Sequence, residues 1–140
     1  MASFDIKSSG LDTFSRELED LQHHFPREAR QLMLRSGTKA KAIVTSKAKQ
    51  LVKKESGNYL RSIKRGKVWM DAEGTKVRVY SGSPHAHLIE KGHRMVGHEP
   101  GKKEIGFVRG YHVFDKAEQE IDDQWTEIVE QEFDRIMSKL

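Results

Sequence analysis

The sequence contains no cysteine among its 140 residues. This absence excludes a disulfide framework, a thiolate metal site and a cysteine nucleophile, and it suits assembly in the cytosol. The chain also lacks any apolar run approaching the roughly 18 residues that a membrane-spanning helix needs. Its first ten residues contain no apolar signal-peptide core. We therefore expect a soluble protein without a secretory signal.

The motifs of common enzyme classes are missing as well. There is no phosphate-cradling P-loop, no G-x-S-x-G, no dinucleotide fingerprint and no H-E-x-x-H. Five histidines cluster in the second half of the chain, but their spacing matches no common zinc pattern. They are His85, His87, His93, His98 and His112. We expect these to be loop histidines, and we expect no bound metal, no cofactor and no enzymatic activity.

What the chain has in abundance is charge, and the charge is unevenly distributed. Only 36% of the residues are hydrophobic while 33% are charged, so the core is lean, which favours a protomer completed by its neighbours. Residues 35–67 contain eleven basic residues and one acidic residue, whereas residues 113–140 contain nine acidic and three basic residues. The basic segment could bind nucleic acid, or the two segments could pair by charge complementarity. The acidic end favours the second reading, and no aromatic residue for base stacking lies between Arg27 and Asn58.

Hydrophobic periodicity predicts one α+β domain over residues 1–140. A helical repeat indicates two N-terminal helices, one over residues 12–25 and one from Pro26 to about residue 53, and a long C-terminal helix over residues 113–138. Alternating residues predict strands at 67–71 and 76–81, which form a small antiparallel sheet that the last helix packs across. Residues 1–10 are expected to be a flexible N-terminus, and residues 82–112 a long irregular loop.

The same patterns predict which side chains are buried and which form a charged surface. The predicted core contains Phe14, Leu18, Leu21, Leu32, Ile43, Ile121, Trp125 and Ile128. Glu132 is assigned to the polar face of the last helix. We expect a basic and an acidic set to face each other across subunits, at least in part. These sets are Lys39, Lys47, Lys49, Lys53 and Lys54, and Glu120, Asp123, Glu127 and Glu130.

Two short motifs flank the predicted strands. Their residues are Gly57, Leu60 and Ile63 in SGNYLRSIK, and Ala86, Glu90, Gly92 and His93 in PHAHLIEKGHR. In this order, and followed by a looser match around Phe114 and Ala117, they resemble the tail-completion, or head–tail joining, family of tailed bacteriophages (minor tail protein Z-like). The resemblance extends over about residues 10–138, although the proline that the family has before its last helix is absent here.

The resemblance implies a structural protein of the phage neck, located in the virion and assembled in the host cytoplasm. It implies a homo-oligomeric ring of six subunits between connector or head-completion proteins and tail tube or tail terminator proteins, with passing contact to DNA and none to a membrane. It gives Glu90 a structural role, and its position before Gly92 suits a carboxylate that binds backbone amides or a basic side chain such as Arg61 or Arg94. We expect the segment 82–110 to contact other subunits or proteins. The alternatives are a nucleic-acid-binding module that uses the basic helix 35–67 and a metal-dependent hydrolase that uses the histidines.

Overall fold

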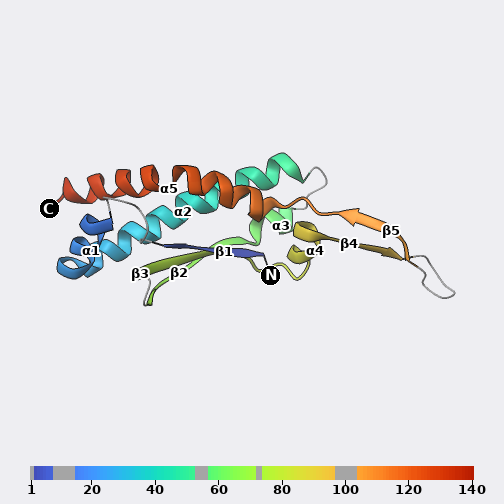
Figure 1. Ribbon diagram of the computed structural model, residues 1–140, viewed down its shortest axis with the longest axis horizontal. Helices are drawn as coiled ribbons and strands as arrows, with labels where there is room; N and C mark the ends of the chain where they lie inside the picture. Colours follow the sequence, from blue (N-terminus) through green and yellow to red (C-terminus); the bar gives the residue numbers. More distant parts are fainter. Residues whose placement is uncertain (1, 8–14, 53–56, 72–73, 97–103) are drawn as a thin grey trace.

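The computed structural model describes residues 2–7, 15–52, 57–71, 74–96 and 104–140. They form an elongated α+β molecule, as the sequence predicts (Figure 1). In chain order the elements are β1 (Ser3–Lys7), α1 (Ser15–His24), α2 (Pro26–Leu51), α3 (Gly57–Arg61), β2 (Ile63–Asp71), β3 (Gly74–Ser81), α4 (Ala86–Lys91), β4 (Gly92–Val96), β5 (Glu104–Arg109) and α5 (Val113–Met137).

The main sheet has three antiparallel strands in the order β1-β3-β2. Alternation along the central strand explains its place: Val77 and Val79 are completely buried, while Arg78 between them is exposed. Both predicted strands are confirmed. Strand β2 begins four residues earlier than the sequence predicts, and its register shifts between Arg65 and Val68. Such an irregularity breaks the two-residue repeat on which the prediction depends.

The two long helices lie side by side and antiparallel, and α2 separates α5 from most of the sheet (Figure 1). The expectation that the C-terminal helix packs across the sheet is therefore wrong in detail. The alanine-rich face of α2 packs on β2 and β3, and α5 reaches the sheet mainly at the edge strand β1. There the indole Nε1 of Trp125 donates a hydrogen bond of 2.9 Å to the carbonyl oxygen of Lys7.

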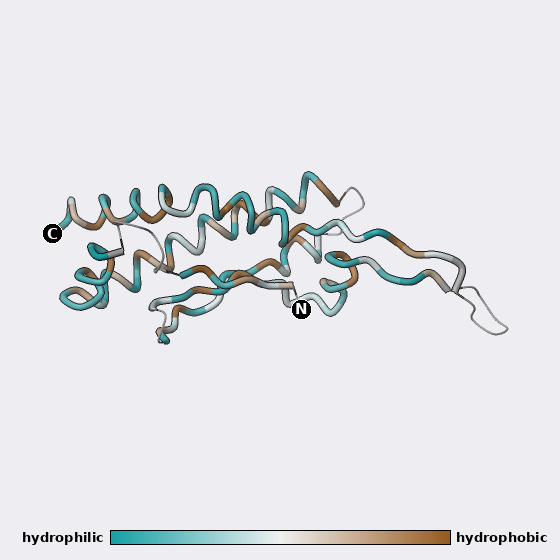
Figure 2. Tube along the Cα trace, in the orientation of Figure 1, coloured by the Kyte–Doolittle hydropathy of each residue, from teal (hydrophilic) through white to brown (hydrophobic). Residues whose placement is uncertain are grey.

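The core lies between α2, α5 and the sheet, where Figure 2 shows hydrophobic positions on the facing sides. The predicted core residues Leu18, Leu21, Leu32, Ile121, Trp125 and Ile128 are buried. Ile43 is only partly buried, and Phe14 lies outside the described residues. No helix in the described parts of the chain is long and apolar enough to cross a bilayer.

Two segments that were predicted to be irregular have regular structure. Residues 3–7 are not a flexible N-terminus but strand β1, which pairs with β3 and buries Phe4 and Ile6. Residues 82–112 contain helix α4 and the antiparallel strands β4 and β5 instead of a long loop. These two strands form a hairpin that projects from one end of the molecule, opposite the end where α1 and the C-terminus lie (Figure 1).

Candidate functional site

The two sequence motifs meet at the root of the projecting hairpin, the region formed by α3, α4 and the start of α5. In the first motif, Gly57 opens α3, and Ile63, at the start of β2, is buried. The hydroxyl groups of Ser62 and Ser81 are 2.6 Å apart, which joins the end of the first motif to the end of β3. Leu60 packs partly buried against the same core. The first motif thus holds the end of β3, from which the chain continues into α4.

Glu90 of the second motif caps helix α5 from outside that helix. Its side chain is 5% exposed, and its Oε1 accepts a hydrogen bond from the backbone N–H of Phe114 at 2.8 Å. Its Oε2 accepts one from the N–H of Asp115 at 3.0 Å. The first N–H groups of a helix have no partner within it, and a negative charge is favourable there. The structural role expected for Glu90, binding backbone amides, is thus what the geometry shows.

The backbone reinforces the same junction. Tyr111 N–H donates to the carbonyl oxygen of Ile89 at 2.8 Å, and His112 N–H donates to that of Glu90 at 3.0 Å. The chain then turns into α5 through His112, whose φ of 52° is left-handed. With the two carboxylate bonds, four hydrogen bonds hold the end of α4 against the start of α5.

Two glycines let the strands of the hairpin approach each other where it leaves the molecule. Gly92 has a φ of 85°, and a Cβ atom there would collide with the carbonyl oxygen of Val108. A Cβ at Gly110 would collide with the carbonyl oxygen of Glu90. L side chains rarely adopt the backbone angle of Gly92, so the position requires glycine. Ala86, at the start of α4, is completely buried.

Tyr59 of α3 places a neutral phenol in this region. Burial, and second the negative charge of Glu90, raise the pKa of Tyr59 from 10.0 to about 12. The phenol, which is protonated at physiological pH even at its ordinary pKa, thus stays protonated to a higher pH. The charge of Glu90 of α4 thus acts on Tyr59 of α3, while the Glu90 carboxylate binds the start of α5.

The histidines do not converge. His85, His87 and His93 are exposed, and the ring Nδ1 of His93 contacts only the neighbouring carbonyl oxygen of Arg94; His98 lies outside the described residues. Among the residues that the structure describes, Glu90, His112 and Asp115 form the one group whose ligand atoms lie within 4.8 Å of one another. Both oxygens of Glu90 already accept backbone N–H groups at the positive end of a helix, which disfavours a cation. The geometry fits a helix cap better than a metal site.

The hairpin itself exposes large hydrophobic side chains. Phe107 is 60% exposed, Met95 41% and Val108 36%. Beyond α4 at the root, no described helix or strand packs extensively on β4 or β5. Figure 2 shows a hydrophobic segment on β5, in the part of the molecule that lies farthest from the core. The hairpin is thus a projection with exposed apolar side chains on both of its strands.

The charged sets predicted from the sequence are partly used within the chain. Lys47 Nζ lies 3.0 Å from Glu120 Oε2, and Lys39 Nζ lies 3.3 Å from Glu132 Oε1, because α2 and α5 are antiparallel neighbours. For Lys39, Lys47 and Glu120 the structure therefore shows partners in the same subunit. Lys49, Asp123, Glu127 and Glu130 are exposed on the outer faces, and their role between subunits stays a prediction. Lys53 and Lys54 lie outside the described residues.

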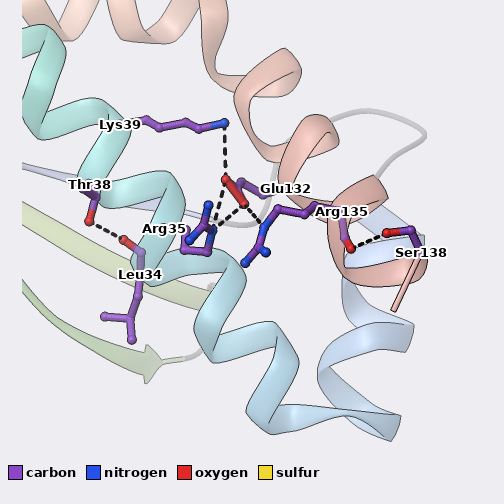
Figure 3. A network of polar contacts seen from close by, with 7 residues as sticks. All are labelled: Leu34, Arg35, Thr38, Lys39, Glu132, Arg135 and Ser138. Atoms are coloured by element: carbon purple, nitrogen blue, oxygen red, sulfur yellow. Dashed lines mark hydrogen bonds and ion pairs between the residues drawn. The ribbon is translucent and has the colours of Figure 1, made fainter. Parts of the chain in front are cut away.

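Glu132 was assigned to the solvent face, and that assignment is wrong. Its side chain is 2% exposed and receives three cationic groups (Figure 3). Arg35 Nε lies 2.9 Å and Arg135 Nε 3.3 Å from Oε2, while Lys39 approaches the other oxygen. Burial alone raises the pKa of Glu132, but the hydrogen bonds and charges of Arg35 and Lys39 outweigh it and leave the pKa lowered. Glu132 is therefore an ionised link between α2 and α5.

Comparison with known protein families identifies the family of this chain. Residues 12–92 match the family described as "Bacteriophage HK97-gp10, putative tail-component". The chain belongs to this family. The matched segment runs from the region of α1 to Gly92 and includes the first motif and the second motif as far as Gly92, so the resemblance seen in the sequence is confirmed. No curated protein and no solved structure matches the chain significantly.

Membership in this family makes the chain a structural component of a bacteriophage tail, and thereby part of the virion. The nucleic-acid-binding alternative gains no support, since part of the basic face of α2 is paired with α5. Of the motif residues that the sequence singled out, Glu90 caps α5 and Gly92 occupies a position that requires glycine. The sequence showed no sign of the hairpin, whose strands carry charged, polar and glycine residues on both faces.

Proposed function

We propose that this phage tail component is a tail-completion protein that forms a homo-oligomeric ring, of six subunits, at the interface between head and tail. The ring would bind connector or head-completion proteins on one side and tail tube or tail terminator proteins on the other. Its place would be the neck of the virion, after assembly in the host cytoplasm. The number of subunits and the neighbours come from the resemblance to tail-completion proteins.

The projecting hairpin is the observation that carries this proposal. An isolated two-stranded hairpin is marginally stable in water, and this one exposes Phe107 and Met95. Phe107 lies on one face of the hairpin and Met95 on the other, and apolar side chains exposed on a projection suit contacts with another protein. The hydrogen bonds at the root fix the direction of the projection, which suits an element that reaches into a neighbouring protein.

The mechanism we propose is binding without catalysis. General acid or base chemistry needs a titratable group directed at a substrate in a cleft. Glu90, the buried carboxylate of the motif, directs both oxygens at backbone amides instead. Both oxygens of Glu90 are thus occupied by the hydrogen bonds that hold the hairpin root.

The test replaces the apolar surface of the hairpin in the full-length protein. The variant Phe107→Ser/Val108→Ser should remain folded but fail to assemble, as measured by native mass spectrometry, and it should leave heads and tails unjoined in a complementation assay. The matched control is Met70→Ser, because Met70 is 65% exposed at the far end of β2 and lies outside the hairpin. If the hairpin variant forms the same rings and joins particles like the wild type, the proposal is wrong.

A further inference from the structure

The end of the molecule opposite the hairpin contains an apolar groove. It lies between α1 and the C-terminal part of α5 and has a volume of about 260 Å³. Its apolar lining comes from Leu21, Phe25, Phe133 and Met137. Phe25 is 43% exposed and Met137 48%, so the groove opens onto the surface at this end.

The groove also carries negative charge. Glu17 and Asp20 belong to its lining, and they lie three residues apart on α1, which places their carboxylates on one side of the helix. Both side chains are exposed. A ligand for this groove would combine an apolar group with one or two cations beside it.

One face of the hairpin presents that combination. Phe107 pairs with Arg94 across the strands, and Arg109 follows two residues later on β5, so all three side chains share a face. Each of them is exposed. Residues 92–96 and 106–109 contain no acidic residue, and the one acidic residue of β5, Glu104, pairs with Val96 at the other end of the strand. The face is thus an aromatic ring with a cation beside it on each strand.

We propose that this hairpin face docks into the groove of a second copy of the chain. Phe107 would enter the apolar part of the groove, with Arg109 beside Asp20 and Glu17. An apolar cavity of about 150 Å³ holds benzene, so the groove has room for a phenyl ring. Because the hairpin and the groove lie at opposite ends of the long axis, a hairpin cannot reach the groove of its own chain (Figure 1).

This contact joins two different surfaces, which is the kind of interface that produces rings or open filaments. The inference rests on the proposed function in one respect, since it supplies the contact between neighbours in the ring. The docking goes beyond the proposed function because it names the residues on each side of that contact. It also explains why α1 exposes Phe25 and α5 exposes Met137 at the same end.

The absence of cysteine allows a direct test by disulfide trapping in the full-length protein. A disulfide needs Cβ atoms about 3.5–4.5 Å apart, so it reports close approach. Under oxidation, Phe107→Cys/Met137→Cys should give a ladder of covalent multimers on a non-reducing gel. The control Val108→Cys/Met137→Cys places the thiol on the opposite hairpin face and should give a much weaker ladder. Equal ladders, or none from the Phe107 variant, overturn the docking.

Charge exchange supplies a second readout. The reversals Arg109→Glu and Asp20→Arg should each raise the dissociation constant of the assembly about two- to fivefold, and the double reversal should restore it. Phe107→Ala should raise it about 30-fold, as for a central interface anchor. A six-subunit mass without the Phe107 ladder overturns the docking and leaves the proposed ring standing. A protein that stays monomeric in native mass spectrometry overturns both.

Discussion

Replacing Glu90 tests the hairpin root most directly. In Glu90→Ala the buried N–H of Phe114 loses its acceptor, and an unpaired buried group costs about 1–3 kcal/mol. Loss of the negative charge at the helix N-terminus adds about 0.3–1 kcal/mol. We therefore expect the free energy of unfolding to fall by about 1–4 kcal/mol. In Glu90→Gln the amide oxygen keeps one bond while its NH₂ group faces the N–H of Asp115, so the loss should be about 1–2 kcal/mol.

Equilibrium urea unfolding measures both losses, and amide hydrogen exchange locates them. The amides of Phe114 and Asp115 should exchange faster in both variants, because those are the groups that Glu90 protects. Asp123→Asn is the control: Asp123 is an exposed acidic residue further along α5, and its replacement should change stability by less than about 0.5 kcal/mol.

Glu90 does not stabilise the start of α5 if both variants are as stable as the wild type within about 0.5 kcal/mol, or if the exchange of the two amides is unchanged. A further comparison separates stability from hairpin direction. Ile121→Val, in the middle of α5, should cost a similar 0.5–1.5 kcal/mol (about the usual range for this change) far from the root. Glu90→Gln should weaken assembly more than this core variant does.

Three more changes have defined outcomes. Glu132→Gln should lower the free energy of unfolding by about 1–3 kcal/mol at pH 7 in urea unfolding, since the cationic partners of Glu132 are partly exposed and regain water. Because the pKa of Glu132 is lowered in the folded state, this loss should persist above the unfolded pKa of about 4.3 and shrink as the pH falls through the folded pKa. Ser36→Ala should raise or preserve the melting temperature, because the buried Ser36 hydroxyl has no hydrogen-bond partner among the described residues; a marked decrease would show that it has one. Gly110→Ala should disorder the hairpin in amide exchange, whereas Gly82→Ala, where a Cβ meets open space, should be neutral or slightly stabilising; equal effects would refute the close packing at the root.

The helices could be predicted because one face of each is buried. The apolar repeat placed α5 at residues 113–138, and the structure has it at Val113–Met137. Alternation placed β3 correctly because Val77 and Val79 face the core while Arg78 faces water. In both elements a buried face imposes a period on the sequence, and the period is what sequence reasoning detects.

The hairpin could not be predicted for the same physical reason. Neither of its faces is buried within the chain, so no hydrophobic alternation marks β4 and β5. Strand β1 is a different case: Ala2, Phe4 and Ile6 alternate with polar residues, but over too few positions to stand out against a disordered terminus. Its partner β3, which follows much later in the sequence, decides its conformation.

Glu132 shows how a correct period can be misread through residue type. It lies three residues after Val129 and four before Ile136, spacings that place it on the buried face of α5. Its charge suggested the opposite face. The deciding partner, Arg35, is on another helix, and only the antiparallel packing of α2 and α5 brings the two side chains together. The location of Glu90 was predictable, but its target at Phe114 was not.

The root of the hairpin and its two strands have complementary physical roles. Four hydrogen bonds and two tightly packed glycines fix the backbone at the root, while β4 and β5 carry the exposed apolar and cationic side chains. Binding costs less conformational entropy when the binding element is already held in its bound direction. A flexible arm with the same Phe107 would lose that advantage at every contact of a ring. In the proposed ring, Glu90 and Gly92 of one short motif would therefore act without touching a partner, by setting where the exposed residues point.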